Sequence, residues 1–206
     1  RLDGGGGSDI ATWFDATSAV TASLVTNNAT GGGGTDTLAG IENLSGSAFG
    51  DRLTGNAAAN TLRGSSGNDT LDGGAGNDRV DGDTGNDVLL GGLGTDRLHG
   101  DQGADRFDFD TVAESRVGIM RDLIQDFRRA DGDRIDLSTI DANLGAAGDQ
   151  AFSFLGTGAL TGAAQVRFVI SGATTVIQIS NDADSAAEME IQLNGAVSLV
   201  AGDLVL

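Results

Sequence analysis

The sequence predicts an all-β protein whose first part is a solenoid of short strands and whose last part is a cap of antiparallel strands. Three observations support this fold class. Seven nine-residue units follow one another without a gap from Gly46 to Asp108. Glycine supplies 34 of the 206 residues and proline none, which suits a chain of tight turns. Beyond Asp108 the period ends, and segments of alternating apolar and polar residues replace it.

Each nine-residue unit begins with glycine and has two further characteristic positions. The sixth position is occupied by Asp51, Asn60, Asp69, Asp78, Asp87, Asp96 and Asp105. The eighth position is apolar in every unit and is occupied by Leu53, Leu62, Leu71, Val80, Leu89, Leu98 and Phe107. A strand formed by the last three residues of a unit is about 10 Å long. It can bury only its one apolar side chain, so neighbouring units must stack to shelter it.

Fainter copies of the unit precede this run. The segment GGGGTDTLA begins at Gly31 and places Asp36 at the sixth position, and GGGGSDIAT begins at Gly4. We therefore expect residues 1–108 to form the repeat domain, with degenerate units at its N-terminal end. Residues 109–206 are expected to form the cap.

The cap is predicted from three alternating segments, QVRFVI, TTVIQIS and EMEIQLNG. The period of two places alternate residues on one face of each strand. The apolar residues that share a face in this way are Val166, Phe168 and Ile170, then Ile177 and Ile179, then Met189, Ile191 and Leu193.

Charge and composition indicate which ligands the chain binds. The net charge of −18 makes nucleic acid an unsuitable partner and favours cations. The absence of cysteine excludes disulfides and thiolate metal sites. One apolar side chain per unit is little burial against the entropy of ordering a glycine-rich chain. Stacked aspartates about 5 Å apart would also repel one another. Calcium, which prefers six to eight oxygen ligands, resolves both problems.

The units resemble the RTX repeat, whose pattern is G-G-x-G-x-D-x-U-x. The resemblance implies a parallel β-roll with two units per coil and several calcium ions held between the turns of units n and n+2. The aspartate pairs so implied are Asp51 with Asp69, Asp69 with Asp87, Asp87 with Asp105, and Asp78 with Asp96. The fourth-position glycines that belong to the same turns are Gly67, Gly76, Gly85, Gly94 and Gly103.

The first two units depart from the RTX pattern. Asn60 replaces an aspartate, and Phe49 and Ala58 stand where the fourth position is usually glycine. The start of the run is therefore expected to be packed rather than metal-bound, and a site joining Asn60 to Asp78 is not expected.

The stretch RDLIQDFRRADGDRIDLSTID and the closing GDLVL resemble the C-terminal region of serralysin-type (peptidase M10) secreted metalloproteases. The chain is also similar, less completely, to the repeat modules of secreted alginate epimerases. Both resemblances imply a bacterial extracellular protein exported by type I secretion machinery, which reads an uncleaved C-terminal signal. The N-terminus RLDGGGGSDI has no signal-peptide core, and the chain is expected to be the C-terminal piece of a longer protein. No apolar run approaches the roughly 20 residues of a membrane span.

Two acidic segments in the cap region have two interpretations each. The segment NDADSAAEME resembles a family segment that can hold another calcium, here through Asp182, Asp184 and Glu188, and the alternative is a polar hairpin loop. Asp131 and its neighbours Asp133 and Asp136 are expected to form a turn between strands, with a metal site as the alternative.

The sequence shows no catalytic constellation. It has one histidine, His99, where a zinc protease needs an H-E-x-x-H helix, and it has no G-x-S-x-G elbow and no tyrosine. His99 is expected to be a solvated residue at the ninth position of its repeat. We do not expect this segment to be an enzyme by itself, although it resembles the C-terminal part of one.

The predicted function is that of a calcium-driven folding switch and type I secretion carrier at the end of an extracellular protein such as a metalloprotease or another hydrolase. One alternative is a module that binds an alginate-like polysaccharide, in which arginines grip uronate carboxylates. The arginines assigned to that role are Arg128, Arg129, Arg134 and Arg167. A second alternative is a segment of a surface-layer protein or adhesin.

Overall fold

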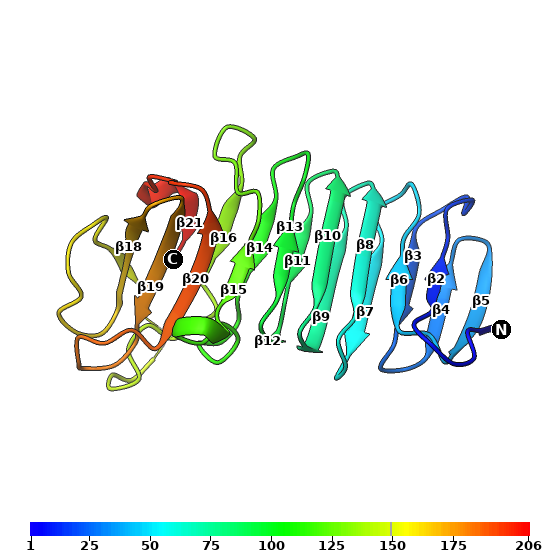
Figure 1. Cartoon of the computed structure of the whole chain (residues 1–206), viewed down its shortest axis with the longest axis horizontal. Helices are drawn as coiled ribbons and strands as arrows, with labels where there is room; N and C mark the ends of the chain where they lie inside the picture. Colours follow the sequence, from blue (N-terminus) through cyan, green and yellow to red (C-terminus); the bar gives the residue numbers. More distant parts are fainter. Residues whose placement is uncertain (149) are drawn as a thin grey trace.

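The computed structural model describes residues 1–148 and 150–206 and consists almost entirely of β-strands. Two long sheets run along the molecule, with the N-terminus at one end and the strands of the C-terminal region at the other (Figure 1). In spatial order the first sheet contains β1 (Leu2–Asp3), β5 (Gly34–Ala39), β4 (Asn28–Gly31), β3 (Val20–Ser23), β7 (Arg52–Asn56), β9 (Thr70–Gly76), β11 (Val88–Leu90), β14 (Arg106–Asp108), β16 (Arg134–Asp136) and β21 (Leu204–Val205), and β12 (Leu93–Gly94) pairs with β9.

The second sheet contains β17 (Ser153–Phe154), β18 (Gln165–Ser171), β19 (Thr174–Ser180), β20 (Met189–Asn194), β15 (Asp122–Ile124), β13 (Arg97–His99), β10 (Arg79–Thr84), β8 (Thr61–Ser66), β6 (Asn43–Ser45) and β2 (Ile10–Thr12). Two short 3-10 helices, η1 (Gly118–Met120) and η2 (Ala201–Asp203), lie in the C-terminal region.

Successive units alternate between the two sheets, so that each strand pairs in parallel with the strand two units away. Leu71 of β9 stands opposite Leu53 on one side and Leu89 on the other. In the second sheet, Val80 of β10 stands opposite Leu62 and Leu98. This register of 18 residues confirms the parallel β-roll with two units per coil.

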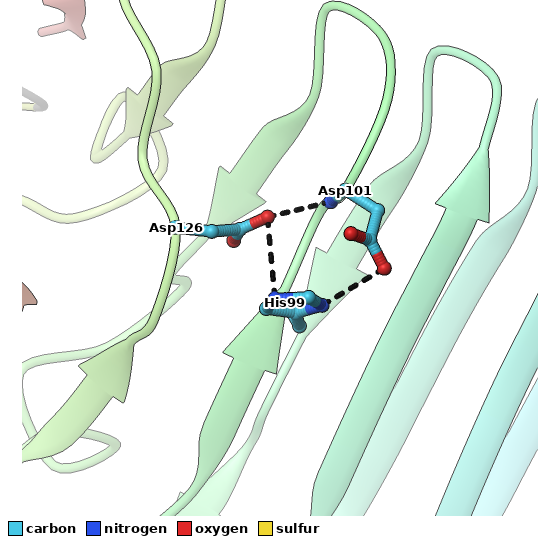
Figure 2. A group of neighbouring side chains, drawn as sticks. All are labelled: His99, Asp101 and Asp126. Carbon is cyan, nitrogen blue, oxygen red and sulfur yellow. Dashed lines mark hydrogen bonds and ion pairs between the residues drawn. The ribbon is translucent and has the colours of Figure 1, made fainter.

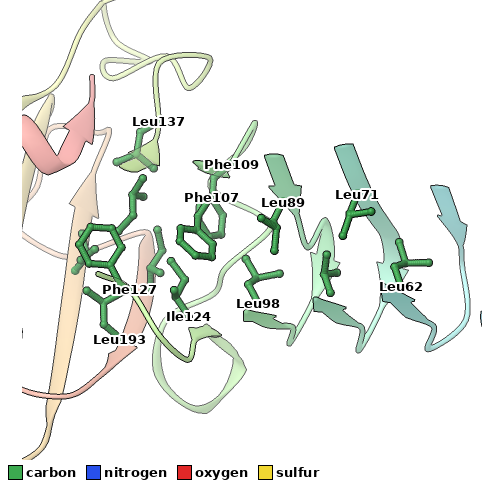
Figure 3. Close-up of a cluster of buried hydrophobic side chains, with 14 of the residues drawn as sticks. Leu62, Leu71, Leu89, Leu98, Phe107, Phe109, Ile124, Phe127, Leu137 and Leu193 are labelled. Carbon is green, nitrogen blue, oxygen red and sulfur yellow. The ribbon is translucent and has the colours of Figure 1, made fainter. Parts of the chain in front are cut away.

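The core is a row of side chains enclosed between the two sheets. All seven eighth-position residues are fully buried, and Figure 3 shows Leu62, Leu71, Leu89, Leu98 and Phe107 following one another along the roll. The row continues without interruption into the C-terminal region, where Phe107 packs against Phe127 with ring centroids 6.3 Å apart.

Both sheets cross residue 108, where the nine-residue period ends. β15 pairs in parallel with β13, with Ile124 opposite Leu98, and β16 pairs in parallel with β14, with Ile135 opposite Phe107. The loops before β15 and β16 are longer than those of the repeat, because 26 and 28 residues replace 18 between neighbouring coils. The end of the period therefore marks longer loops and not a break in either sheet.

The predicted antiparallel cap is present as β18, β19 and β20, which extend the second sheet beyond β15. The residues assigned to its apolar face are buried except Ile170, which is 41% exposed. Ile170 lies next to the turn that connects β18 to β19, where the strands extend past the core.

The two N-terminal copies of the unit adopt different structures. In the copy that begins at Gly4, Ala11 of β2 stands opposite Leu44 of β6, which in turn stands opposite Leu62, so this copy joins the roll. The copy that begins at Gly31 does not stack on the seven-unit run. Its strand β5 pairs in parallel with β1, with Leu38 opposite Leu2, and antiparallel with β4, which forms a second hairpin with β3.

Candidate calcium site

The sixth-position residues form two ladders, one at each edge of the roll where the turns meet the strands. In each ladder, the backbone N–H of one residue donates to the Oδ1 atom of the aspartate 18 residues later. In the first-sheet ladder the donor–acceptor distances are 2.6 Å for Asp51 to Asp69, 2.8 Å for Asp69 to Asp87 and 2.9 Å for Asp87 to Asp105. In the second-sheet ladder they are 2.7 Å both for Asn60 to Asp78 and for Asp78 to Asp96.

Each ladder extends one step beyond the repeats. The N–H of Asp96 donates to Asp122 at 2.7 Å, and the N–H of Asp105 donates to Asp133 at 3.1 Å. Sequence reasoning missed Asp122 and treated Asp133 as part of a turn. A signal was present, because both residues keep the D-x-U spacing with Ile124 and Ile135. This spacing was overlooked because the five glycine-rich residues that precede the aspartate in the repeats are missing before Asp122 and Asp133.

Six ladder carboxylates have a second oxygen without a hydrogen-bond donor. While Oδ1 accepts a backbone N–H, Oδ2 is buried without a donor in Asp69, Asp78, Asp87, Asp96, Asp105 and Asp122. A buried oxygen with no partner costs free energy, and a charged one costs more. Six such atoms lie along the two ladders, where a bound cation would offset this cost.

The pKa values of these carboxyl groups also show that the charged form lacks a compensating partner. Burial, helped by the charges of neighbouring carboxylates and opposed by the backbone hydrogen bond, raises the pKa of Asp69 and Asp105 to about 7. Burial likewise raises the pKa of Asp87 and Asp96 to about 6, and that of Asp122 to about 8. Without a counter-ion, this arrangement disfavours the carboxylate form at neutral pH.

Close approach requires glycine at the first position of each unit and at the fourth position of the last five units. A β-carbon on Gly85 would overlap the carbonyl oxygen of Gly67, and Gly85 has φ +143°. At the first position, a β-carbon on Gly91 would lie 2.6 Å from Oδ2 of Asp96. The oxygens without donors therefore face glycine backbone, in turns that also carry backbone carbonyl oxygens and asparagine side chains. An all-oxygen donor set of this kind fits calcium and not zinc or copper.

The start of the run is packed by protein groups, as the departures from the repeat pattern predict. Asn60 donates from Nδ2 to the carbonyl of Glu42 at 2.7 Å. Asp51 is also satisfied, because Oδ1 accepts from the N–H of Val20 at 2.7 Å and Oδ2 accepts from the N–H of Ser47. The sequence paired Asp51 with Asp69 as calcium ligands, but the structure leaves no oxygen of Asp51 without a protein donor.

Asp36, the other candidate ligand in the N-terminal region, lies on β5 and is not part of either ladder. Its Oδ1 accepts from the terminal amine of Arg1 at 3.2 Å on an exposed surface. The antiparallel hairpin of β4 and β5 occupies the place of a coil, and this removes Asp36 from the position that the repeat pattern assigned to it.

The acidic loop between β19 and β20 brings its three candidate ligands together. Asp182, Asp184 and Glu188 each place one carboxylate oxygen within 4.8 Å of the others. The N–H of Asp184 donates to Asp182 at 3.0 Å, and the N–H of Asn181 donates to Glu188 at 2.9 Å. These contacts fit a calcium loop and also a polar hairpin, so both interpretations remain open.

We expect the calcium-free chain to gain β structure when the pH is lowered from 7 to about 4. The ordinary aspartate pKa of 3.8 is raised in the fold to about 7 at Asp69 and Asp78, so the folded state binds protons that the unfolded chain has released. Stability from this source is fully present below pH 3.8 and is lost as the pH rises through about 7. Circular dichroism in calcium-free buffer measures the effect. An unchanged or weaker β signal at pH 4 would contradict it.

Comparison with known proteins places the chain in a family. Residues 5–206 match the family described as peptidase M10 serralysin C terminal. The chain belongs to this family. Membership confirms the predicted resemblance, and an RTX domain of this family binds calcium and is not itself the catalytic part. No helix in the described residues is long and apolar enough to cross a membrane.

One solved structure supports the same fold, while comparison with curated protein sequences found no match. The solution structure of the AlgE6R2 subunit from the Azotobacter vinelandii mannuronan C5-epimerase is 28% identical to the serralysin C-terminal domain described here, with a TM-score of 0.53. That match covers 74% of this chain and 90% of the epimerase subunit. The AlgE6R3 subunit of the same enzyme is also 28% identical over 76% of this chain and 78% of its own, with a TM-score of 0.38.

Proposed function

We propose that this serralysin C-terminal domain is a calcium-driven folding switch at the end of an extracellular protein, and that its two aspartate ladders are the calcium sites. The observation that carries the proposal is the set of six buried Oδ2 atoms without donors. They form four neighbouring pairs, namely Asp69 with Asp87, Asp87 with Asp105, Asp78 with Asp96, and Asp96 with Asp122. The first three of these pairs are those of the repeat pattern, and the fourth replaces the pair of Asp51 with Asp69.

The switch follows from the charges of the ladder residues. In a calcium-poor cytoplasm the carboxylates must either remain charged in a buried row or take up protons, and both alternatives disfavour the fold at neutral pH. A bound calcium ion supplies the positive charge and the additional oxygen coordination that the turns lack. Extracellular calcium modules bind with dissociation constants of about 10⁻⁴ to 10⁻³ M, so the chain folds only after it leaves the cell.

Equilibrium dialysis of the folded chain tests the proposed sites. Four neighbouring pairs predict about four tightly bound calcium ions, since each ion needs oxygens from two adjacent turns. The variant Asp184→Asn should reveal whether the loop between β19 and β20 holds one more. Fewer than two bound ions in the unmodified chain would contradict the ladder sites.

We further propose that the domain is a type I secretion carrier, most suitably for a serralysin-type metalloprotease or another hydrolase. Deleting residues 203–206 is then expected to stop export and to lower the free energy of unfolding by a few kcal/mol, because Leu204 is buried opposite Ile135. The measurement is the ratio of secreted to retained protein in cells that carry the exporter.

The variant Arg129→Ala is the matched control for this deletion. It breaks the contacts of Arg129 with Asp203, at 2.8 and 3.0 Å from Nε, but leaves the terminal sequence intact. It should weaken the fold and leave export normal. Normal export of the truncated chain would refute the signal role of the closing residues and would leave the calcium switch untouched.

Polysaccharide binding is a second candidate, but not through the arginines that the sequence suggested. Arg129 pairs with Asp203, Arg128 lies 3.7 Å from Asp131, and Arg167 donates to Gln178 at 2.7 Å, so these three side chains are engaged within the protein. Arg134 lines a smaller pocket beside Arg129, but the acidic residues Asp133 and Asp203 line the same pocket and suit an anionic sugar poorly. The candidate site is instead a groove of about 490 Å³ at β8, β10 and β13.

The groove has the chemistry that an acidic sugar chain requires. Arg79 and Arg97 stand opposite each other on β10 and β13, and amide and hydroxyl groups of Asn43, Thr61 and Asn77 line the same groove. Arg79 pairs with Asp81 at 2.8 Å, so Arg97 is the arginine assigned to the sugar carboxylate. Arginines bind carboxylates through two parallel hydrogen bonds, and amides suit sugar hydroxyls. The similar solved structure belongs to a mannuronan C5-epimerase, which supports a uronate ligand.

Calorimetric titration with alginate oligomers tests this second function. Arg97→Ala should weaken binding at least tenfold, because it removes a charged hydrogen-bond donor from the groove. Arg52→Ala is the matched control, since Arg52 holds the same position of the repeat on the first sheet. Equal affinity of the two variants, or no heat with the unmodified chain, would exclude the groove.

A further inference from the structure

The single histidine of the chain occupies a cluster that lies apart from both ladders. His99 ends β13, and its side chain lies between the carboxylates of Asp101 and Asp126 (Figure 2). The sequence predicted a solvated residue, but the side chain is only 28% exposed. The reason is that Asp126, just beyond β15, lies over the turn that follows β13. The sequence did not predict this contact, because Asp126 lies beyond the end of the nine-residue period.

The two ring nitrogens of His99 face carboxylate oxygens at different distances. Nδ1 lies 3.0 Å from Oδ2 of Asp101, and Nε2 lies 3.6 Å from Oδ2 of Asp126, both as ion-pair contacts. In a neutral imidazole, one nitrogen carries the proton and the other presents a lone pair. When Nδ1, which faces Asp101, carries the proton, the Nε2 lone pair therefore faces a carboxylate oxygen with no hydrogen between them.

The separation of these two atoms suits a shared metal ion. Two ligands at about 2.1 Å from a tetrahedral zinc ion lie about 3.4 Å apart. The hydrogen bond from the opposite ring nitrogen to a carboxylate is the arrangement that orients metal-binding histidines in proteins. Asp101 occupies the position of that orienting carboxylate.

Asp126 is fixed in place before any ion binds. Its Oδ1 accepts from the N–H of Gly100 at 3.0 Å, its Oδ2 accepts from the N–H of Asp101 at 2.7 Å, and its side chain is 8% exposed. Each carboxylate oxygen has two lone pairs, so both backbone bonds leave capacity for a metal. A site with one ligand already immobilised loses less entropy on binding.

We propose that His99, Asp101 and Asp126 form a binding site for a divalent transition-metal ion of the zinc type. Nε2 of His99 and the carboxylate of Asp126 are the direct ligands, and Asp101 orients the imidazole. Calcium does not suit this site, because it prefers oxygen alone, while imidazole nitrogen suits zinc, nickel and copper. The remaining coordination positions are open to water or to a donor from a partner. A bound ion would tie the turn after β13 to the segment after β15.

Nuclear magnetic resonance of the calcium-saturated chain provides a direct test, because one histidine gives one set of imidazole signals. Titration with zinc chloride in excess calcium should shift these signals and saturate at one equivalent. His99→Gln should abolish this binding step in calorimetry, and Asp126→Asn should weaken it at least tenfold. Asp131→Asn, an exposed carboxylate nearby on the same loop, should leave it unchanged.

Two results would overturn the proposal. One is zinc binding without movement of the His99 signals, which would place the ion elsewhere, for example on the ladders. The other is zinc binding to His99→Gln with the affinity of the unmodified chain. Because Asp126→Asn also weakens two backbone hydrogen bonds, its fold is checked by circular dichroism in calcium, and the imidazole signals of the unmodified chain decide the question if it does not fold.

Discussion

The variant Asp87→Asn is expected to lose two of the four calcium ions of the roll, the largest loss available from one side chain of the first-sheet ladder. Asp87 belongs to two neighbouring pairs, one with Asp69 and one with Asp105, and its Oδ2 is buried without a donor. Asparagine keeps the shape and the oxygen that accepts the N–H of Asp69, but it removes the negative charge on which calcium binding depends. Equilibrium dialysis at saturating calcium counts the ions directly.

Asp51→Asn is the matched control, because it makes the same change in the same ladder. Both oxygens of Asp51 already accept hydrogen bonds from protein donors, so this variant should keep all four ions. Its fold should be weaker, since the buried hydrogen bonds from Val20 and Ser47 lose a charged acceptor. If the two variants lose the same number of ions, the division of the ladder into packed and metal-binding parts is wrong.

Gly85→Ala is expected to destabilise the domain by more than about 4 kcal/mol, an exceptional effect for one methyl group. The added β-carbon would overlap the carbonyl oxygen of Gly67 in the neighbouring coil, so two turns must separate to admit it. That separation also moves apart the oxygens of the proposed calcium site. Urea unfolding at saturating calcium measures the free energy.

The variant Gly33→Ala is the control that separates the cost of steric overlap between coils from the cost of a positive φ angle. Gly33 also has a positive φ, +104°, but a β-carbon there would meet no atom within 4 Å. It should cost only about 1–2 kcal/mol, which is the penalty for placing an L-residue in the left-handed region. Similar small losses in both variants would show that neighbouring coils do not approach as closely as the ladders require.

Much of the roll could be predicted from the sequence, because each unit repeats the same local physics. One apolar residue per unit fixes which side chain is buried, and the glycines allow the turns. Leu71 and Val80 illustrate the result, since both lie in the core in the expected register. The proposed pairing of ladder residues follows from the same register.

The parts that could not be predicted are those where tertiary contacts replace the repeat. Asp122 stands in the second-sheet ladder because the chain returns to it after a loop. The D-x-U spacing is kept there, but the glycine-rich turn that identifies a repeat unit is absent. Asp51 keeps the repeat pattern, yet Ser47 and Val20 occupy the hydrogen-bonding capacity that a metal would use. The enclosure of His99 likewise depends on Asp126, 27 residues away in the chain.

The most direct test of the account is circular dichroism of the chain at pH 7 before and after exhaustive removal of calcium. The buried, donor-free oxygens of the ladders predict that the β spectrum is lost without calcium and returns when millimolar calcium is restored. Magnesium at the same concentration should not restore it, because this ion requires octahedral geometry and retains its water. A β spectrum that persists at pH 7 in the calcium-free chain would contradict the claim that calcium drives folding.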